Sequence, residues 1–137
     1  MQDASRRLAE YVAGARFEDL TPGAVAAAKR STLDTLGCMA AGSSAPGIQT
    51  LLDLAAGWGG TGEATVVGFG HRLPAPVAAW CNGSMARALE IDDCVDFLPV
   101  HPSASAVPAL LALAEQRGGL SGRDFLTALA VGQDVKI

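Results

Sequence analysis

Apolar residues recur every three or four positions along most of this chain, which is the spacing of helices that bury one face. A second signal marks a helix start at Thr21, because a threonine can cap the first turn and Pro22 suits the first helical position. Joints rich in glycine and proline separate the periodic segments. The pattern therefore predicts six helices, at about residues 3–15, 21–41, 48–56, 76–91, from 103 to a stop at Gly118-Gly119, and from 121 onwards.

One segment follows a different pattern. β-branched residues cluster in 64–69, which predicts a strand, and 71–74 predicts a turn after it. The expected fold class is all-α, mainly helical, with at most one short β-strand or hairpin. Helical spacing predicts that the core includes Leu8, Tyr11, Val12, Ile48, Leu51, Leu52, Ala55, Val77, Trp80, Met85, Ala88, Leu89, Val107, Leu110, Leu111, Ala114, Phe125, Leu126, Leu129 and Val135.

Composition suggests that the chain has partners. Its 137 residues suit one domain, and half of them are hydrophobic. Only 18% are charged, so we expect much of the apolar surface to contact a partner subunit or another part of the same protein. The net charge of −4 and the lack of a basic stripe predict no nucleic-acid partner. No unbroken apolar run approaches the ~18 residues of a membrane helix, so no membrane partner is expected either.

The number and spacing of the cysteines help to predict where in the cell the protein is located. Cys38, Cys81 and Cys94 are odd in number and lack a CxxC spacing, which argues against a disulfide framework and a structural zinc site. Reduced thiols, together with a polar start to the sequence, predict a cytoplasmic protein.

The segment from Ala88 to Ser103 is the densest in chemistry. It holds four acidic residues, a cysteine and a histidine within sixteen positions. A helix is expected to end in the carboxylates, and His101-Pro102 is expected to open the next helix. Acids and a base would then meet where two helix ends come together, an arrangement that acid–base catalysis needs.

The candidate catalytic residues are His101, Asp92 and Asp93. Pro102 favours an extended His101, and the nearby helix N-terminus favours a neutral imidazole, which can act as a base. Carboxylates at a helix C-terminus oppose the helix dipole, so a functional site explains Asp92 and Asp93 more readily than stability does. The alternatives are an ordinary loop histidine and a solvated helix end.

Three further residues are candidates for substrate binding. Glu90 could face the same cleft, or solvent. Cys94 lies beside carboxylates that disfavour a thiolate, so we expect it to line the substrate or pack rather than attack. Ser103 and the helix that follows could hold a substrate carboxylate. Asp92, Asp93, Asp96 and His101 are possible metal ligands, but their spacing matches no metal motif, so neither a metal nor another cofactor is predicted.

Several segments together resemble the N-terminal part of the MmgE/PrpD family, which includes 2-methylcitrate dehydratase, cis-aconitate decarboxylase and iminodisuccinate epimerase. Their order and spacing cover nearly the whole chain. The segments are Lys29–Gly42, Ala64–Gly68, Ala78–Asp93, His101–Leu110 and Ala114–Gly122.

This resemblance implies a large helical domain with an inserted α+β lid, usually in a homodimer. It implies that the active-site acids fall in Leu89–Asp93 and that His101 faces the substrate pocket. Cys94 stands where several members have threonine, and Arg87 stands at a position that others fill with histidine or arginine. The family's other catalytic residues would lie beyond Ile137. We therefore expect residues 1–137 to be a truncated helical domain without the lid, poorly active alone.

The expected function is lyase or isomerase chemistry on a small di- or tricarboxylate, similar to 2-methylcitrate dehydratase, as part of a longer homodimeric enzyme. A proton alpha to a carboxylate would be removed, and hydroxide or carbon dioxide lost, or the carbon reprotonated. His101 would act as base or acid, with Asp92 and Asp93 orienting it or transferring protons. The alternatives are a non-catalytic helical oligomerisation module and a metal-dependent hydrolase.

Overall fold

Helices make up most of the computed structural model, which describes residues 3–137. Six α-helices lie in this range, as predicted, together with the one-turn helix η1 (Phe17–Asp19) and a two-stranded antiparallel hairpin. The helices are α1 (Ala4–Gly14), α2 (Pro22–Gly42), α3 (Ile48–Gly57), α4 (Ala75–Arg87), α5 (Ser103–Arg117) and α6 (Gly122–Asp134). The strands are β1 (Ala64–Thr65) and β2 (Arg72–Leu73), with Ala64 opposite Leu73 and Thr65 opposite Arg72.

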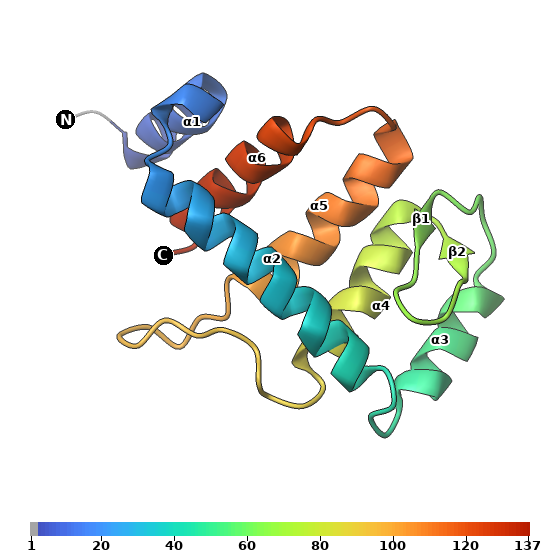
Figure 1. Cartoon of the computed structure of the whole chain (residues 1–137). Helices are drawn as coiled ribbons and strands as arrows, with labels where there is room; N and C mark the ends of the chain where they lie inside the picture. The colour runs from blue at the N-terminus through green and yellow to red at the C-terminus, as the bar shows by residue number, and fades with distance from the viewer. Residues whose placement is uncertain (1–2) are drawn as a thin grey trace.

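The long helix α2 organises the molecule. It packs against α4, α5 and α6, while α3 and the hairpin lie towards its C-terminal end (Figure 1). The segment 88–102 between α4 and α5 forms a long irregular loop below these helices. No helix within residues 3–137 is both long enough and apolar enough to cross a membrane.

The predicted helix starts are confirmed by their hydrogen bonds. The Thr21 hydroxyl accepts the backbone N–H of Ala24 at 3.1 Å, and Pro22 occupies the first turn of α2. The Ser121 hydroxyl accepts the N–H of Asp124 at 3.1 Å at the start of α6. Each cap satisfies a donor that the first helical turn cannot pair internally.

The core lies where α2, α4 and α5 meet. Its largest fully buried apolar side chains are Met39, Met85, Leu129, Val66 and Val107. The helices α2 and α4 approach closely at Gly42, where an added Cβ would lie 2.0 Å from the carbonyl oxygen of Met85. A side chain at this position would push the two helices apart.

The hairpin is tied to the helices by polar side chains. Asn82 of α4 is buried; its Oδ1 accepts the N–H of Val67 and its Nδ2 donates to the Thr65 carbonyl, both at 2.9 Å. Glu115 of α5 accepts the Thr65 hydroxyl at 2.6 Å and pairs with Arg72 at 3.1 Å. So short a hairpin is marginal alone, and these contacts hold it in place.

The predicted strand was only partly correct. The structure has a strand at Ala64–Thr65 alone, and its partner, Arg72–Leu73, lies in the predicted turn. Gly68 and Gly70 adopt φ of 83° and 67°, so the chain reverses between the strands. The backbone region with positive φ favours glycine, which explains why the reversal falls there.

Several predicted core residues are exposed. The prediction was wrong for Leu8, Tyr11 and Val12 of α1, for Trp80 of α4, for Val135 after α6, and for Ala88 and Leu89, which follow α4. Trp80 stacks instead on Trp58, with ring centroids 5.5 Å apart and planes 14° from parallel. The prediction was correct for Ile48, Leu52 and Ala55 of α3, and for Met85, Val107 and Leu129.

Candidate functional site

The helix α4 ends earlier than predicted, and this changes the setting of the acids. It stops at Arg87 rather than near Ile91, and Glu90 turns the chain with a φ of 55°. Asp92 and Asp93 therefore do not occupy a helix C-terminus, and the predicted conflict with the helix dipole is absent. Arg87 occupies the last turn instead, where a positive charge is favourable.

Arg87, Asp92 and His101 form one polar cluster. The Nη1 atom of Arg87 donates to Oδ1 of Asp92 at 2.7 Å and lies 2.9 Å from Nδ1 of His101. The Asp92 side chain is only 1% exposed, whereas those of Arg87 and His101 are 35% and 31% exposed. The hydrogen bond to Asp92 raises the pKa of Arg87 above its usual value, so the guanidinium stays charged.

The second oxygen of Asp92 lacks a partner. Oδ2 is buried and lies 3.2 Å from Nδ1 of His101, yet it accepts no hydrogen bond from the residues that the structure describes. An unpaired carboxylate oxygen in the protein interior is costly, so its position beside an ionisable imidazole calls for a functional explanation.

This cluster borders a cavity. Arg87, His101 and Trp80 line a hollow of about 570 Å³ between α4 and α5. Its other lining residues are small or carry hydroxyl groups: Ala79, Gly83, Ser84, Ala104 and Ser105. Because Nδ1 of His101 faces Arg87 and Asp92, Nε2 is the ring nitrogen left for a ligand.

Asp93 has different partners from Asp92. Its Oδ1 accepts the backbone N–H of Ser103 at 3.2 Å, and its Oδ2 accepts the Ser103 hydroxyl. Gln133 of α6 donates to the Ser103 hydroxyl oxygen at 2.8 Å and to that of Ser31 in α2 at 3.2 Å. Asp93 also borders a separate hollow of about 410 Å³ beside α2. The structure thus pairs Asp92 with His101, but directs Asp93 to the start of α5.

A lysine approaches the same helix start. Lys136 donates to the Pro102 carbonyl at 3.0 Å and contacts the Ser105 hydroxyl. Burial of its ammonium group lowers its pKa, and the charge of Asp93 partly offsets this. Since Ser105 borders the cavity of His101, Lys136 places a positive charge close to that cavity.

The three predicted substrate-binding residues have different surroundings. Glu90 is exposed and accepts from Nη2 of Arg87 at 2.9 Å. Cys94 is an exposed free thiol. Ser103 is 1% exposed and its hydroxyl is already paired with Asp93 and Gln133, which leaves little room for direct contact with a ligand.

The sequence reasoning missed three polar residues of this region as site residues: Arg87, Gln133 and Lys136. Periodicity placed Arg87 on a helix, Gln133 between the core positions Leu129 and Val135, and Lys136 after them, with no motif around any of the three. One signal was present for Arg87, because a lone arginine shortly before an acidic cluster is a natural ion-pair partner.

No cluster of three or more His, Cys, Asp or Glu side chains that could hold a metal ion occurs within residues 3–137. At the paired Asp92 and His101, the guanidinium of Arg87 contacts both groups, where a cation would otherwise bind.

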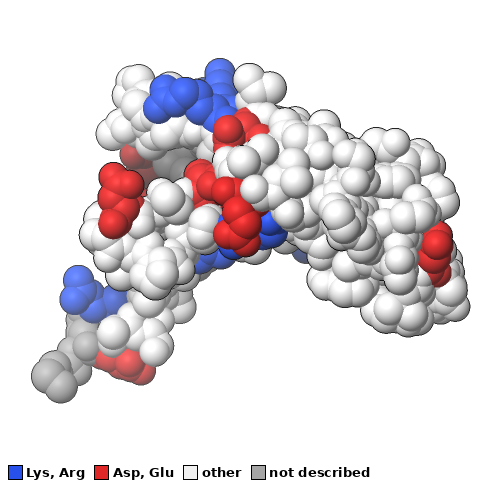
Figure 2. Space-filling model, turned by 90° about the horizontal axis from the view of Figure 1, so that it is seen from below, with Lys and Arg blue, Asp and Glu red and all other residues white. Residues whose placement is uncertain are grey.

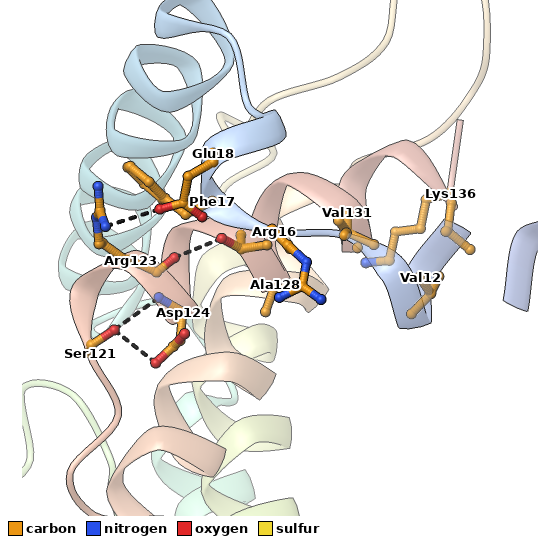
Figure 3. A pocket seen from close by; sticks show the side chains of 14 residues that line it. Val12, Arg16, Phe17, Glu18, Ser121, Arg123, Asp124, Ala128, Val131 and Lys136 are labelled. Atoms are coloured by element: carbon orange, nitrogen blue, oxygen red, sulfur yellow. Dashed lines mark hydrogen bonds and ion pairs between the residues drawn. The ribbon is translucent and has the colours of Figure 1, made fainter. Parts of the chain in front are cut away.

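A larger hollow, of about 810 Å³, lies between α1, η1 and α6, and Lys136 borders it. Figure 3 shows Arg123 paired with Glu18, with Phe17 beside it; the ion-pair distance is 3.1 Å, and the guanidinium carbon of Arg123 lies 4.5 Å from the ring centre of Phe17. The apolar residues Val12, Val131 and Val135 also line this larger hollow.

Charge is unevenly distributed over the face seen from below. Acidic side chains gather near the middle of this face, and one side of it is almost free of Lys, Arg, Asp and Glu (Figure 2). Large apolar residues are exposed in several elements, including Leu33 at 74% and Phe97 at 77%. Apolar exposure on this scale is typical of surfaces that other protein segments cover.

Comparison with known proteins agrees with the sequence resemblance. The model of the MmgE/PrpD N-terminal domain matches residues 6–137. A cis-aconitate decarboxylase-like protein of Aspergillus oryzae is 30% identical over 95% of this chain. The cis-aconitate decarboxylases of Mus musculus and Homo sapiens are each 30% identical over 99% of it. The chain spans only 28–29% of the length of these relatives. It belongs to the MmgE/PrpD family, in the region of the family's N-terminal domain.

Proposed function

We propose that this chain supplies an acid–base group to an enzyme of the lyase or isomerase type that acts on a small di- or tricarboxylate. The observation that carries the proposal is the imidazole of His101, held by Arg87 and Asp92 at the wall of a cavity of about 570 Å³. Membership of the MmgE/PrpD family and the similarity to proteins named as cis-aconitate decarboxylases support the same class of substrate.

The surroundings of the cavity suit an anionic ligand. Arg87 lines it, Lys136 lies beside Ser105, and the N-terminal turn of α5 carries a partial positive charge. A substrate carboxylate bound here would bring its alpha carbon close to His101. Loss of the alpha proton leaves an enolate-like anion, which then expels hydroxide, or the carbon regains a proton on either face. In a decarboxylation, the bond to carbon dioxide breaks without prior loss of the alpha proton, and the resulting carbanion takes up a proton from an acid group of the site.

The other candidate residues support this site from different positions. Asp92 orients His101 through Arg87, and Asp93 fixes Ser103 and thereby the start of α5. Ser103 thus acts through the helix rather than by touching the ligand. Glu90 and Cys94, both exposed, are proposed to approach the substrate when the rest of the enzyme is assembled.

We also propose that residues outside this chain complete the active site. The relatives are more than three times as long, since the chain spans only 28–29% of them. In this proposal the complete enzyme is a cytoplasmic homodimer, the chain alone has little activity, and 2-methylcitrate dehydration is one of the reactions to be tested.

The test is turnover by the complete enzyme that contains this chain, with 2-methylcitrate and cis-aconitate as substrates. His101→Gln is expected to lower kcat by about 10²–10⁴-fold, the usual contribution of a positioned acid or base. His71→Gln, in the hairpin turn, is the matched control and should leave kcat unchanged. Full activity of His101→Gln on both substrates would show that the proposed role of His101 is wrong.

One observation favours a second candidate, a non-catalytic helical oligomerisation module. Large apolar residues such as Leu33, Trp58 and Phe97 are exposed and available for association. Analytical ultracentrifugation of the chain separates the cases, since a soluble monomer at high concentration contradicts the module. Association without any turnover by the complete enzyme would favour it.

A further inference from the structure

The direction of one hydrogen bond determines what His101 can do. In most pairs of a carboxylate and a histidine, Nδ1–H donates to the carboxylate, which leaves a lone pair on Nε2 to act as a base. The structure places a third group, Arg87, at the same nitrogen. In neutral imidazole, Nδ1 carries either a proton, which Asp92 could accept, or a lone pair, to which Arg87 could donate, so it cannot bond to both.

The geometry favours Arg87. Its Nη1 carries two hydrogens; it donates to Oδ1 of Asp92 at 2.7 Å and lies 2.9 Å from Nδ1 of His101. A guanidinium can only donate, so Nδ1 must accept. The alternative acceptor for a proton on Nδ1 would be Oδ2 of Asp92, which lies farther away at 3.2 Å and takes part in no hydrogen bond within residues 3–137.

We propose that Arg87 holds the neutral imidazole of His101 with its proton on Nε2, the nitrogen left for a ligand in the cavity. Arg87 is thus a positioning residue that acts through His101. This arrangement leaves Oδ2 of Asp92 without a donor, as the structure has it. The buried, unpaired oxygen is the consequence of giving Nδ1 to Arg87.

The chemical meaning of this tautomer rests on the proposed function. With a proton on Nε2, His101 has no lone pair towards the substrate, so of the two acid–base roles it takes the donor's and does not remove the alpha proton. It donates a hydrogen bond to a substrate carboxylate oxygen, where negative charge grows as the enolate-like anion forms. The base that takes the alpha proton is then a different group, and the ligand must present an oxygen acceptor to Nε2.

The tautomer is measured directly by NMR on the whole chain labelled with ¹⁵N-histidine. The chain has only two histidines, and His71→Gln assigns their signals. At mildly alkaline pH, where imidazole is neutral, we expect Nδ1 of His101 to show the ¹⁵N shift of an unprotonated nitrogen and Nε2 that of a protonated one. A protonated Nδ1 in the wild-type chain overturns the proposal whatever the variants do.

Variants identify the residue responsible. Arg87→Met leaves Oδ2 of Asp92 as the nearest partner of Nδ1, so the proton is expected to move to Nδ1 and the two ¹⁵N shifts to exchange character. Glu90→Gln changes only the exposed partner of Arg87, and the wild-type pattern should persist. An unchanged pattern in a folded Arg87→Met chain also overturns the proposal. Should that variant fail to fold, Asp92→Asn must keep the wild-type tautomer, because the Arg87 contact remains, and a change there counts against the assignment.

These spectra do not depend on turnover. A wrong tautomer with an inactive His101→Gln enzyme refutes the role of Arg87 alone. The expected tautomer with a fully active His101→Gln enzyme refutes the proposed function alone.

Discussion

Asp92 and Asp93 are adjacent in the chain, but their carboxylates bind different helices. Asp92 accepts from Arg87 at the end of α4, at 2.7 Å, and Asp93 accepts the N–H of Ser103 at the start of α5, at 3.2 Å. The pair therefore fastens both helices to one loop. Asp93 works as a helix cap supplied from ten positions upstream, because Pro102 itself has no side chain that could cap.

This capping role predicts a stability effect. Asp93→Ala should lower the free energy of unfolding by about 1–2 kcal/mol, the usual loss for a helix cap. Urea denaturation followed by circular dichroism measures the change. The matched control is Asp96→Ala, an exposed aspartate of the same loop, which should change stability by less than about 0.5 kcal/mol. Equal effects of the two variants would contradict the assignment.

Two glycines of α2 should respond in opposite directions to the same change. Gly42→Ala places a Cβ against the backbone of Met85 and should lower the free energy of unfolding by about 3 kcal/mol or more. Gly37→Ala meets no atom within 4 Å and should raise it by about 1 kcal/mol, because alanine is the better helix former. Thermal or urea unfolding of both variants measures these changes. An unchanged free energy of unfolding in Gly42→Ala would contradict the prediction, because it would mean that α2 and α4 can move apart at little energetic cost.

Removing the amide of Asn82 should loosen the hairpin. Asn82→Ala leaves the N–H of Val67 and the carbonyl of Thr65 without partners at a buried position, which should lower the free energy of unfolding by about 3 kcal/mol. Hydrogen exchange at Val67 should accelerate as well. Thr61→Ala, an exposed residue before the hairpin, is the control and should leave both measurements nearly unchanged.

Acid should weaken the contact between Glu115 and the hairpin. Burial raises the pKa of Glu115, but hydrogen bonds from Thr65 and the charge of Arg72 outweigh it, so the net pKa lies below the usual 4.5. A lowered carboxylate pKa stabilises the folded state above about pH 4.5 and loses this effect as the pH falls through the folded-state value. Glu115→Gln should therefore be less stable than the wild-type chain at neutral pH, and the gap should close in acid. Urea midpoints across this pH range test it, and a gap that does not depend on pH would contradict the argument.

The sequence predicted the fold class and helix starts well, because these depend on local chemistry. The capping side chains of Thr21 and Ser121 act on their own helices, so neighbouring residues suffice to predict them. The face of a helix that is covered depends on distant elements. Trp80 matched the helical repeat of α4, yet it stacks at the surface on Trp58, the residue that follows α3, which no local pattern indicates.

The candidate site was located from sequence, but its geometry was not. The cluster of acids and a histidine drew attention to residues 88–103, where the structure brings Asp92 and His101 together. The separation of Asp92 from Asp93 depends on the turn at Glu90, whose φ of 55° is unusual for a residue with a side chain. The part played by Arg87 depends on the same turn, because the chain must reverse before Asp92 can return to it. Backbone reversals of this kind leave little signal in a single sequence.

The stacked pair of Trp58 and Trp80 has a practical consequence. These are the only two tryptophans of the chain, and Trp80 also borders the cavity that Arg87 and His101 line. The tryptophan fluorescence of this chain therefore originates from a single location that adjoins this cavity. Binding of an unlabelled ligand in this cavity should therefore change the tryptophan emission. A fluorescence titration can then measure ligand binding without a catalytic assay.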